Sequence, residues 1–151
     1  MKNNECDAYN ESRSKSQAYG REFTILKLQG PNGPIFAIFP AENNTYNSSE
    51  IAHGTHPQKS WGQGFSDVFT IVADFNTKVL TVTFNPSSIA RTYPIIGSAH
   101  THPNTSAYMP SLQDTNIAAS YPNMQFEIWD AARGIYQYNS SGHFSATRGC
   151  Q

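Results

Sequence analysis

Two histidines separated by a single residue are the strongest sign of chemistry in the sequence. His100 and His102 flank Thr101 and are followed directly by Pro103. On a β-strand, residues i and i+2 point to the same face, so both imidazoles can reach one point about 2 Å from each nitrogen. Such a pair can hold a divalent metal ion, although two ordinary histidines on a surface strand are the simpler interpretation of the pair alone.

A carboxylate follows the histidines at a spacing that lets it join them. A helix is predicted from Ser111 to about Ser120, and Asp114 falls in its first turn. Two histidines and one carboxylate leave the fourth position of a tetrahedral zinc ion open for a water molecule, whose pKa zinc lowers to about 7. The sequence therefore predicts a catalytic zinc (Zn2+) site with His100, His102 and Asp114 as ligands.

Ser111 and Asp114 also have a purely structural interpretation. A serine at the start of a helix caps free amide groups, and an acidic residue in the first turn interacts favourably with the helix dipole. Each effect stabilises a helix by about 1 kcal/mol. Capping and catalysis are compatible at the same residues, so this interpretation does not exclude the site.

The order His-x-His-Pro, a short loop and then Ser-x-x-Asp resembles the signature of the JAMM/MPN+ (JAB-like) zinc metallopeptidases. The resemblance implies that the two histidines and Asp114 bind zinc, that Ser111 stabilises an oxyanion, and that an upstream glutamate positions the water. Glu22 is our candidate for this base because it opens the first predicted strand, whereas Glu42 and Glu50 lie in a predicted loop. More narrowly, the chain is similar to the JAB-like domain of undefined function found at the ends of RHS-repeat polymorphic toxins.

This resemblance implies a zinc-dependent hydrolase of peptide or isopeptide bonds, with a JAB/MPN fold of the cytidine-deaminase-like type. The substrate would be a protein, a ubiquitin-like conjugate or a peptidoglycan peptide, and an immunity protein or a parent secreted toxin would be the partner. Two alternatives stay open. One is a catalytically silent MPN-type binding or scaffold module, and the other is an amidase or peptidase of peptidoglycan cross-links.

The elements that position these residues are predicted from hydrophobic patterns and turn signals. They are a hairpin around the turn 30–33, a second hairpin of 68–73 and 79–84, a strand over 93–101, the helix over 111–120, and a last hairpin of 124–129 and 134–138. Residues 41–65 predict a long loop, and residues 1–20 predict a polar tail or a short helix. Residues 21–151 are therefore expected to form one α+β domain, with a mixed, mainly antiparallel β-sheet and one helix packed on it. The resemblance implies that this is a JAB-like catalytic domain.

Composition narrows the class of protein further. The chain has 151 residues, the size of one domain, and a formal net charge of -1 without a cluster of Lys or Arg, so we do not expect a nucleic-acid partner. No apolar run approaches the roughly 18 residues that span a bilayer, and a signal-peptide pattern is absent, so we do not expect membrane insertion. The sequence does not distinguish a cytoplasmic protein from an exported effector or a domain of a larger chain.

Five further residues with reactive side chains have weaker interpretations. Cys6 and Cys150 stand near opposite ends of the chain, which often lie close together, so they could form a disulfide, although two free thiols are the simpler interpretation. His53 and His56 lie in the predicted loop without a following Ser-x-x-Asp, so the pattern gives no support for metal binding there and leaves their role open. His143 is expected at the surface.

Overall fold

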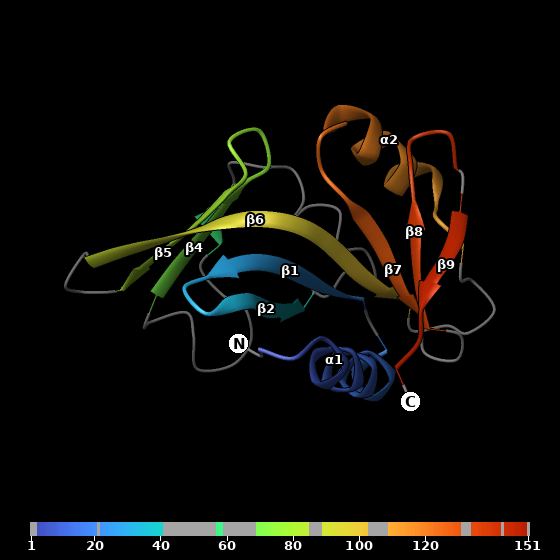
Figure 1. Cartoon of the computed structure of the whole chain (residues 1–151), viewed down its shortest axis with the longest axis horizontal. Coiled ribbons are helices and arrows are strands. Elements are labelled where there is room, and N and C mark those ends of the chain that lie inside the picture. Colours follow the sequence, from blue (N-terminus) through green and yellow to red (C-terminus); the bar gives the residue numbers. More distant parts are fainter. Residues whose placement is uncertain are drawn as a thin grey trace.

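A computed structural model of the chain describes residues 3–20, 22–40, 57–58, 69–84, 89–102, 109–130, 134–142 and 144–150. These residues form two α-helices and nine β-strands (Figure 1). In chain order the elements are α1 (Glu5–Tyr19), β1 (Phe23–Gly30), β2 (Gly33–Pro40), β3 (Pro57–Gln58), β4 (Phe69–Asp74), β5 (Val79–Phe84), β6 (Ile89–His102), α2 (Leu112–Ser120), β7 (Phe126–Asp130), β8 (Gly134–Tyr138) and β9 (Phe144–Arg148).

The strands in the described part of the chain belong to one sheet, in which β6 connects all the others. Residues 89–94 of β6 pair with β5, its residues 95–100 pair with β1, and its residues 98–102 pair with β7. β4 and β3 extend the sheet beyond β5, β2 extends it beyond β1, and β8 and β9 extend it beyond β7. The β6–β7 pair is parallel and the other pairs are antiparallel, so the predicted mixed, mainly antiparallel sheet is confirmed.

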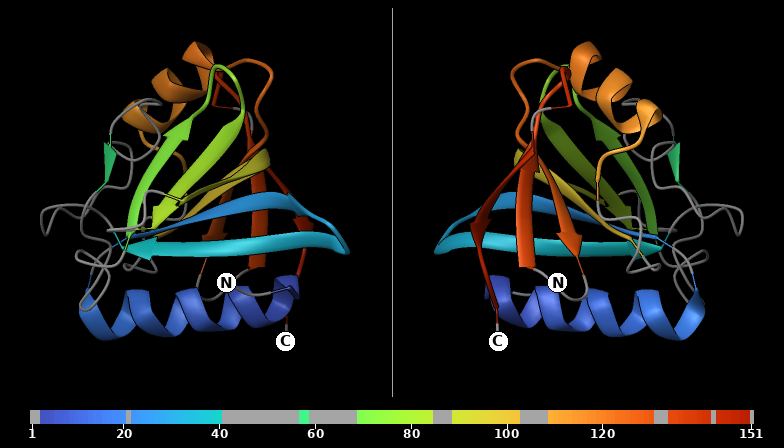
Figure 2. Two further views of the ribbon diagram at one scale, coloured as in Figure 1. Left: turned by 90° about the vertical axis from the view of Figure 1, so that its left-hand side faces the viewer. Right: turned by 90° about the vertical axis from the view of Figure 1, so that its right-hand side faces the viewer.

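The two helices cover opposite faces of the sheet (Figure 2). α2 connects β6 to β7 and buries Ile117 and Ala118 in one hydrophobic cluster, whereas α1 buries Ala8 and Tyr9 in a second cluster that contains Trp129. The described part of the chain is therefore α+β as predicted, with two helices, of which α1 falls in the segment predicted as a polar tail or short helix. Neither of these helices is both long enough and apolar enough to cross a membrane.

Side chains alternate between the two faces along the last residues of β6. Thr101 contacts Ser16 of α1 through its hydroxyl, and Ala99 belongs to the same α1-side cluster as Trp129. His100, in contrast, contacts Asp114 of α2. The predicted ligand His100 therefore lies on the α2 side of the sheet, and Ala99 and Thr101 lie on the α1 side.

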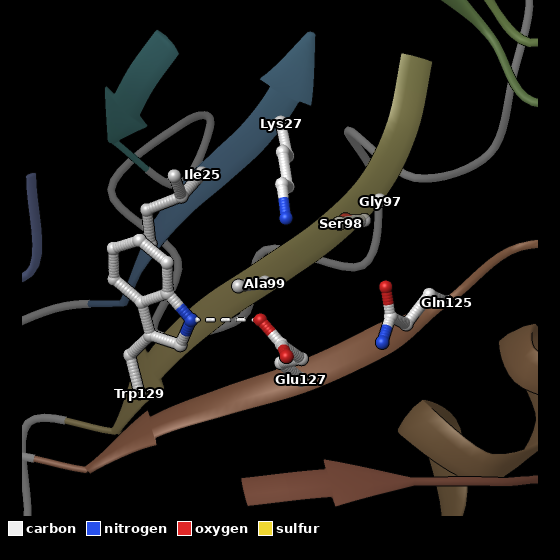
Figure 3. Close-up of a pocket in the computed structure, with 8 residues that line it drawn as sticks. All are labelled: Ile25, Lys27, Gly97, Ser98, Ala99, Gln125, Glu127 and Trp129. Carbon is white, nitrogen blue, oxygen red and sulfur yellow. Dashed lines mark hydrogen bonds between the residues drawn. The ribbon is translucent and has the colours of Figure 1, made fainter. Parts of the chain in front are cut away.

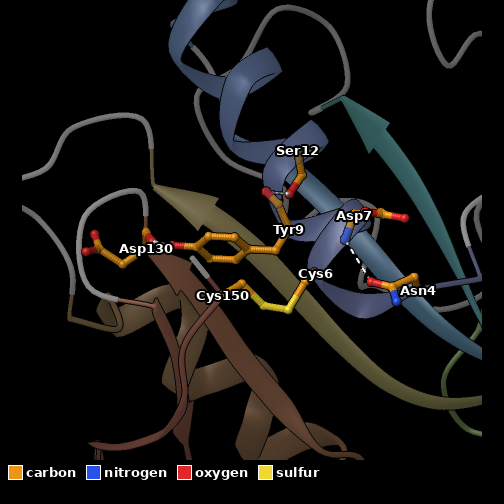
Figure 4. Close-up of a disulfide and its surroundings, with 7 residues drawn as sticks. All are labelled: Asn4, Cys6, Asp7, Tyr9, Ser12, Asp130 and Cys150. Atoms are coloured by element: carbon orange, nitrogen blue, oxygen red, sulfur yellow. Dashed lines mark hydrogen bonds between the residues drawn. A yellow bond between two sulfur atoms is a disulfide. The ribbon is translucent and has the colours of Figure 1, made fainter.

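The segment predicted as a polar tail or short helix is α1, a helix of 15 residues that is fixed at several points. Asn4 caps its start by accepting a hydrogen bond from the amide of Asp7. Cys6 forms a disulfide with Cys150, with 5.3 Å between the two Cα atoms, so the disulfide is the alternative that the structure adopts. The Tyr9 hydroxyl donates a hydrogen bond to the main-chain carbonyl of Asp130 at the end of β7 (Figure 4).

The three predicted hairpins are present as β1–β2, β4–β5 and β7–β8. The strand predicted over 93–101 is the later part of β6, which begins earlier, at Ile89. β9 was not predicted and pairs with β8. The predicted loop of residues 41–65 lies outside the described residues, apart from Pro57–Gln58, which form β3.

Candidate metal centre

The predicted metal ligands come from the end of β6 and the first turn of α2. Because α2 is the crossover between the parallel strands β6 and β7, its first turn begins beyond the end of β6, close to the last residues of that strand. His100, His102 and Asp114 are each only 7% exposed, and together they form a buried group of potential ligands. The structure therefore brings together the three ligands that the sequence predicts.

Three ligand atoms meet in this group. Nε2 of His100 lies 3.0 Å from Nε2 of His102 and 3.2 Å from Oδ2 of Asp114, and the distance from His102 Nε2 to Asp114 Oδ2 is 3.8 Å. A triangle with these three sides has a circumscribed circle of radius about 2.0 Å. Zinc binds nitrogen and carboxylate oxygen at roughly 2.0–2.2 Å, so an ion of this size fits among the three atoms without rearrangement.

The donor set also suits a metal ion chemically. Neutral imidazole and carboxylate bind several divalent transition metals, zinc among them, and the three ligands in the described part of the chain fill three of the four positions of a tetrahedral ion. The geometry therefore supports a metal ion at this position, and the donor atoms admit more than one divalent metal.

Ser111 holds Asp114 in place through a capping box. The Ser111 amide donates a hydrogen bond of 2.9 Å to Asp114 Oδ2, and the Asp114 amide donates one of 3.1 Å to Ser111 Oγ. The structural interpretation of this pair is thus confirmed. Because Ser111 Oγ acts as an acceptor in the cap, its own proton is left to donate to another group, and the exposed position of Ser111 lets a substrate reach it.

Charge interactions within the group are strong because it is buried. Burial acts to lower the pKa of His100, but the adjacent Asp114 carboxylate, helped by the charge of Glu22, raises it to about 9. Burial acts to raise the pKa of Asp114, but His100, His102 and the Ser111 amide hold it well below its ordinary value. In the metal-free protein at neutral pH, a proton on His100 therefore provides the positive charge that a metal ion would otherwise supply.

Glu22 lies at the same end of the sheet as the histidines. It immediately precedes β1, is partly buried, and stands two residues before Thr24, which pairs with His100 across the β1–β6 ladder. Its charge raises the pKa of both His100 and Tyr138. This position is compatible with the base role, which stays a prediction.

Tyr138 and Thr24 are two neighbours of His100 that the sequence interpretation does not include. The Tyr138 ring stands edge-on to the His100 ring, with centroids 6.1 Å apart. Burial, with the charges of Asp114 and Glu22, raises the pKa of the Tyr138 hydroxyl, so this group stays protonated. The buried Thr24 hydroxyl has no hydrogen-bond partner among the described residues. Sequence alternation marks both as inward-facing strand residues, which does not distinguish them from core residues.

The opposite face of the sheet carries a small hollow lined by residues of β1, β6 and β7 and by Gln125 (Figure 3). Trp129 donates a hydrogen bond of 3.2 Å to Glu127 Oε1 there, and the Lys27 amine points toward the same space. The lining residues are Ile25, Lys27, Gly97, Ser98, Ala99, Gln125, Glu127 and Trp129. The hollow is separated from the histidines by the sheet itself. His53, His56 and His143 lie outside the described residues.

Comparison of the chain with protein-family models, with curated proteins and with solved structures gave no match.

Proposed function

We propose that the chain is a zinc-dependent hydrolase of peptide or isopeptide bonds. The observation that carries the proposal is the buried triangle of two imidazole nitrogens and one carboxylate oxygen, whose size suits zinc. These three ligands, found among the described residues, fill three of the four positions of a tetrahedral zinc ion, as in catalytic sites. The resemblance of its motif to the JAMM/MPN+ signature gives the reaction class.

The roles of the surrounding residues follow from their positions. A zinc ion held by the three ligands would polarise the scissile carbonyl and acidify a water molecule. Glu22 takes a proton from that water and delivers it to the leaving amine as the carbon–nitrogen bond breaks. The Ser111 hydroxyl donates a hydrogen bond to the oxyanion while its oxygen continues to accept from the Asp114 amide.

The disulfide supports an exported protein. Disulfides form and persist in oxidising compartments and are rare in cytosolic proteins. Cys6 and Cys150 join the first helix to the end of the described chain. A secreted effector acting on a protein, a ubiquitin-like conjugate or a peptidoglycan peptide, with an immunity protein as its partner, agrees with this feature.

A metal-free binding module is the second candidate. It is favoured by the ion pair of His100 and Asp114, which satisfies the buried group without a metal ion. In such a protein the capping box and the ion pair would have structural roles alone. Against it, two histidines and one carboxylate are more than one ion pair requires.

Metal content and activity separate the two candidates. The purified parent protein is stripped with a chelator, titrated with Zn2+, and incubated with a mixed peptide library, a ubiquitin isopeptide reporter and cross-linked peptidoglycan dimers, with cleavage read by mass spectrometry. We expect one equivalent of zinc and cleavage of one of these substrates. Glu22→Gln should keep zinc and lose about 10²–10⁴-fold in rate, the usual contribution of a general base.

Glu11→Gln, the same change on α1 at the surface of the fold, is the matched control and should behave as the parent. Zinc uptake that is absent from the parent, or equal in a His100→Ala/His102→Ala variant, would exclude the hydrolase.

A further inference from the structure

Thr101 stands between the two histidine ligands but points to the other face of the sheet. It is 1% exposed. Its Oγ1 accepts a hydrogen bond of 2.9 Å from the amide of Phe23 and donates one of 2.8 Å to Oγ of Ser16, which is also 1% exposed. One buried hydroxyl therefore joins β1, β6 and α1 beside the metal centre.

This hydroxyl stands where the main-chain ladder between β1 and β6 ends. The paired residues run from Leu28 and Ile95 to Thr24 and His100. At the next position the Thr101 side chain accepts from the Phe23 amide. Glu22 directly precedes Phe23 in the chain, so the hydroxyl holds the backbone from which the proposed base projects.

Thr101 Oγ1 makes both hydrogen bonds at once. It donates its single proton to Ser16 Oγ and uses a lone pair to accept from the Phe23 amide. Ser16 is in turn held by α1, which the Cys6 disulfide and the Tyr9 hydroxyl fasten to the rest of the fold (Figure 4). In a buried setting, losing one partner leaves a donor or acceptor unsatisfied, so each link affects the next.

From these contacts we infer that Thr101 and Ser16 are positioning residues, which set the place of Glu22 relative to the metal ligands. The inference rests on the proposed function, in which Glu22 is the base. It assigns a role to α1, whose sequence carries no candidate catalytic residue.

The hydrogen bonds themselves are tested on the metal-free protein by amide exchange in NMR. Thr101→Val keeps the shape of the side chain but removes the hydroxyl, and Thr101→Ser keeps the hydroxyl. The Phe23 amide should be protected in the parent and in Thr101→Ser, and should exchange at least about tenfold faster in Thr101→Val, as expected for one lost hydrogen bond. Equal protection in Thr101→Val would overturn the inference. Thr81→Val in β5, a partly buried position, is the matched control.

The consequence for Glu22 is tested with Co2+ in place of zinc. The visible absorption of the Co2+ form is titrated against pH for the parent, Glu22→Gln, Thr101→Val, Thr101→Ser and Ser16→Ala. We expect Thr101→Val and Ser16→Ala to move the midpoint in the same direction as Glu22→Gln. Their Co2+ dissociation constants should stay close to the parent value, because both hydroxyls lie on the α1 side of the sheet and the ligand side chains lie on the other. Thr101→Ser should restore the parent midpoint.

The outcomes separate the two proposals. If the parent binds neither Co2+ nor Zn2+, the proposed metal site is wrong. If Glu22→Gln leaves the midpoint unchanged, the proposed base role of Glu22 is wrong. In either case the inference about Thr101 and Ser16 is wrong as well. If Glu22→Gln moves the midpoint and Thr101→Val does not, the inference alone is wrong.

Discussion

Nε2 of His100 and Oδ2 of Asp114 lie 3.2 Å apart, and both side chains are buried. The Asp114 carboxylate raises the pKa of His100 to about 9 against the opposing effect of burial. A proton and a metal ion therefore compete for the same nitrogen atom. This competition determines how the site should respond to pH.

Zinc binding should release a proton. Because the pKa of His100 is about 9 in the metal-free protein, most molecules carry this proton at pH 7 and must lose it to bind zinc. Calorimetric titrations at pH 7 in buffers of different ionisation enthalpy should give at least about one proton released per zinc ion, because a zinc-bound water with a pKa of about 7 would add part of a second. Zinc affinity should therefore rise by at least about tenfold per pH unit toward pH 9. A binding enthalpy that is independent of the buffer would contradict the prediction.

The stability of the metal-free protein should fall in alkaline solution. The folded pKa of His100, about 9, is above its ordinary value of 6.5, so this group stabilises the fold fully below pH 6.5 and loses its effect as pH rises through 9. The pKa of Asp114 is below its ordinary value of 3.8, so its effect is present above that pH and is lost in acid. The contribution of the pair to the free energy of unfolding is then greatest between these limits.

Urea unfolding of the metal-free parent at about pH 5, 7 and 9.5 measures this dependence. Asp114→Asn removes the partner charge and should be nearly flat across the alkaline range. A parent protein as stable at the highest pH as at the lowest would show that the ion pair is not formed.

Substitutions at Ser111 should separate capping from catalysis. Ser111→Ala removes the acceptor of the Asp114 amide and should lower the free energy of unfolding by about 1 kcal/mol, whereas glycine, an adequate N-cap, should cost only a few tenths. Both lack the hydroxyl and should lose about 10²–10³-fold in hydrolysis rate if Ser111 steadies the oxyanion. Ser111→Thr should keep both properties. If the hydrolysis rates of the three variants changed in proportion to their free energies of unfolding, Ser111 would have a capping role alone.

The disulfide should contribute substantially to stability. Cys6 and Cys150 are 144 residues apart, so their bond restricts the unfolded chain over nearly its whole length. A Cys6→Ser/Cys150→Ser variant should lose roughly 2–5 kcal/mol in the free energy of unfolding, measured with denaturant. Reductant should destabilise the parent to the same degree and leave the double variant unchanged. A parent insensitive to reductant would show that the two thiols are not joined.

The metal ligands could be predicted from the sequence because the patterns that identify them involve residues close together in the chain. The period of two residues along a strand places His100 and His102 on one side, and the capping pattern places Asp114 in the first turn of α2. The hairpins were predictable for the same reason, since a turn and its two strands are adjacent in the chain. These parts required no knowledge of long-range packing.

α1 is the element whose packing the sequence does not reveal. It buries Ala8, Ser12 and Ser16 at intervals of four residues, with Tyr9 beside them. Small and polar residues lie close to the sheet here, so the helix lacks the apolar stripe by which an amphipathic helix is recognised. Its role in supporting Thr101 became visible only in the folded chain.

The sequence prediction did not include the early part of β6 because its residues are exposed to solvent. Residues 89–92 are exposed, although they pair with β5, so no alternation of apolar and polar residues marks them as a strand. Tyr138 was overlooked because an inward-facing tyrosine is usually a core residue, and its approach to His100 depends on how β8 is placed beside β7.

The pleat of β6 makes the metal centre a test of strand register. Sliding this strand by one residue against β1 and β7 would turn both imidazoles into the surface that packs on α1 and would bring Thr101 to face Asp114. A chain misaligned in this way would have neither the ligand set nor the Thr101 support. The amount of zinc bound during refolding would therefore measure the fraction of molecules in which β6 has its native register, because compact molecules with a shifted register would bind none.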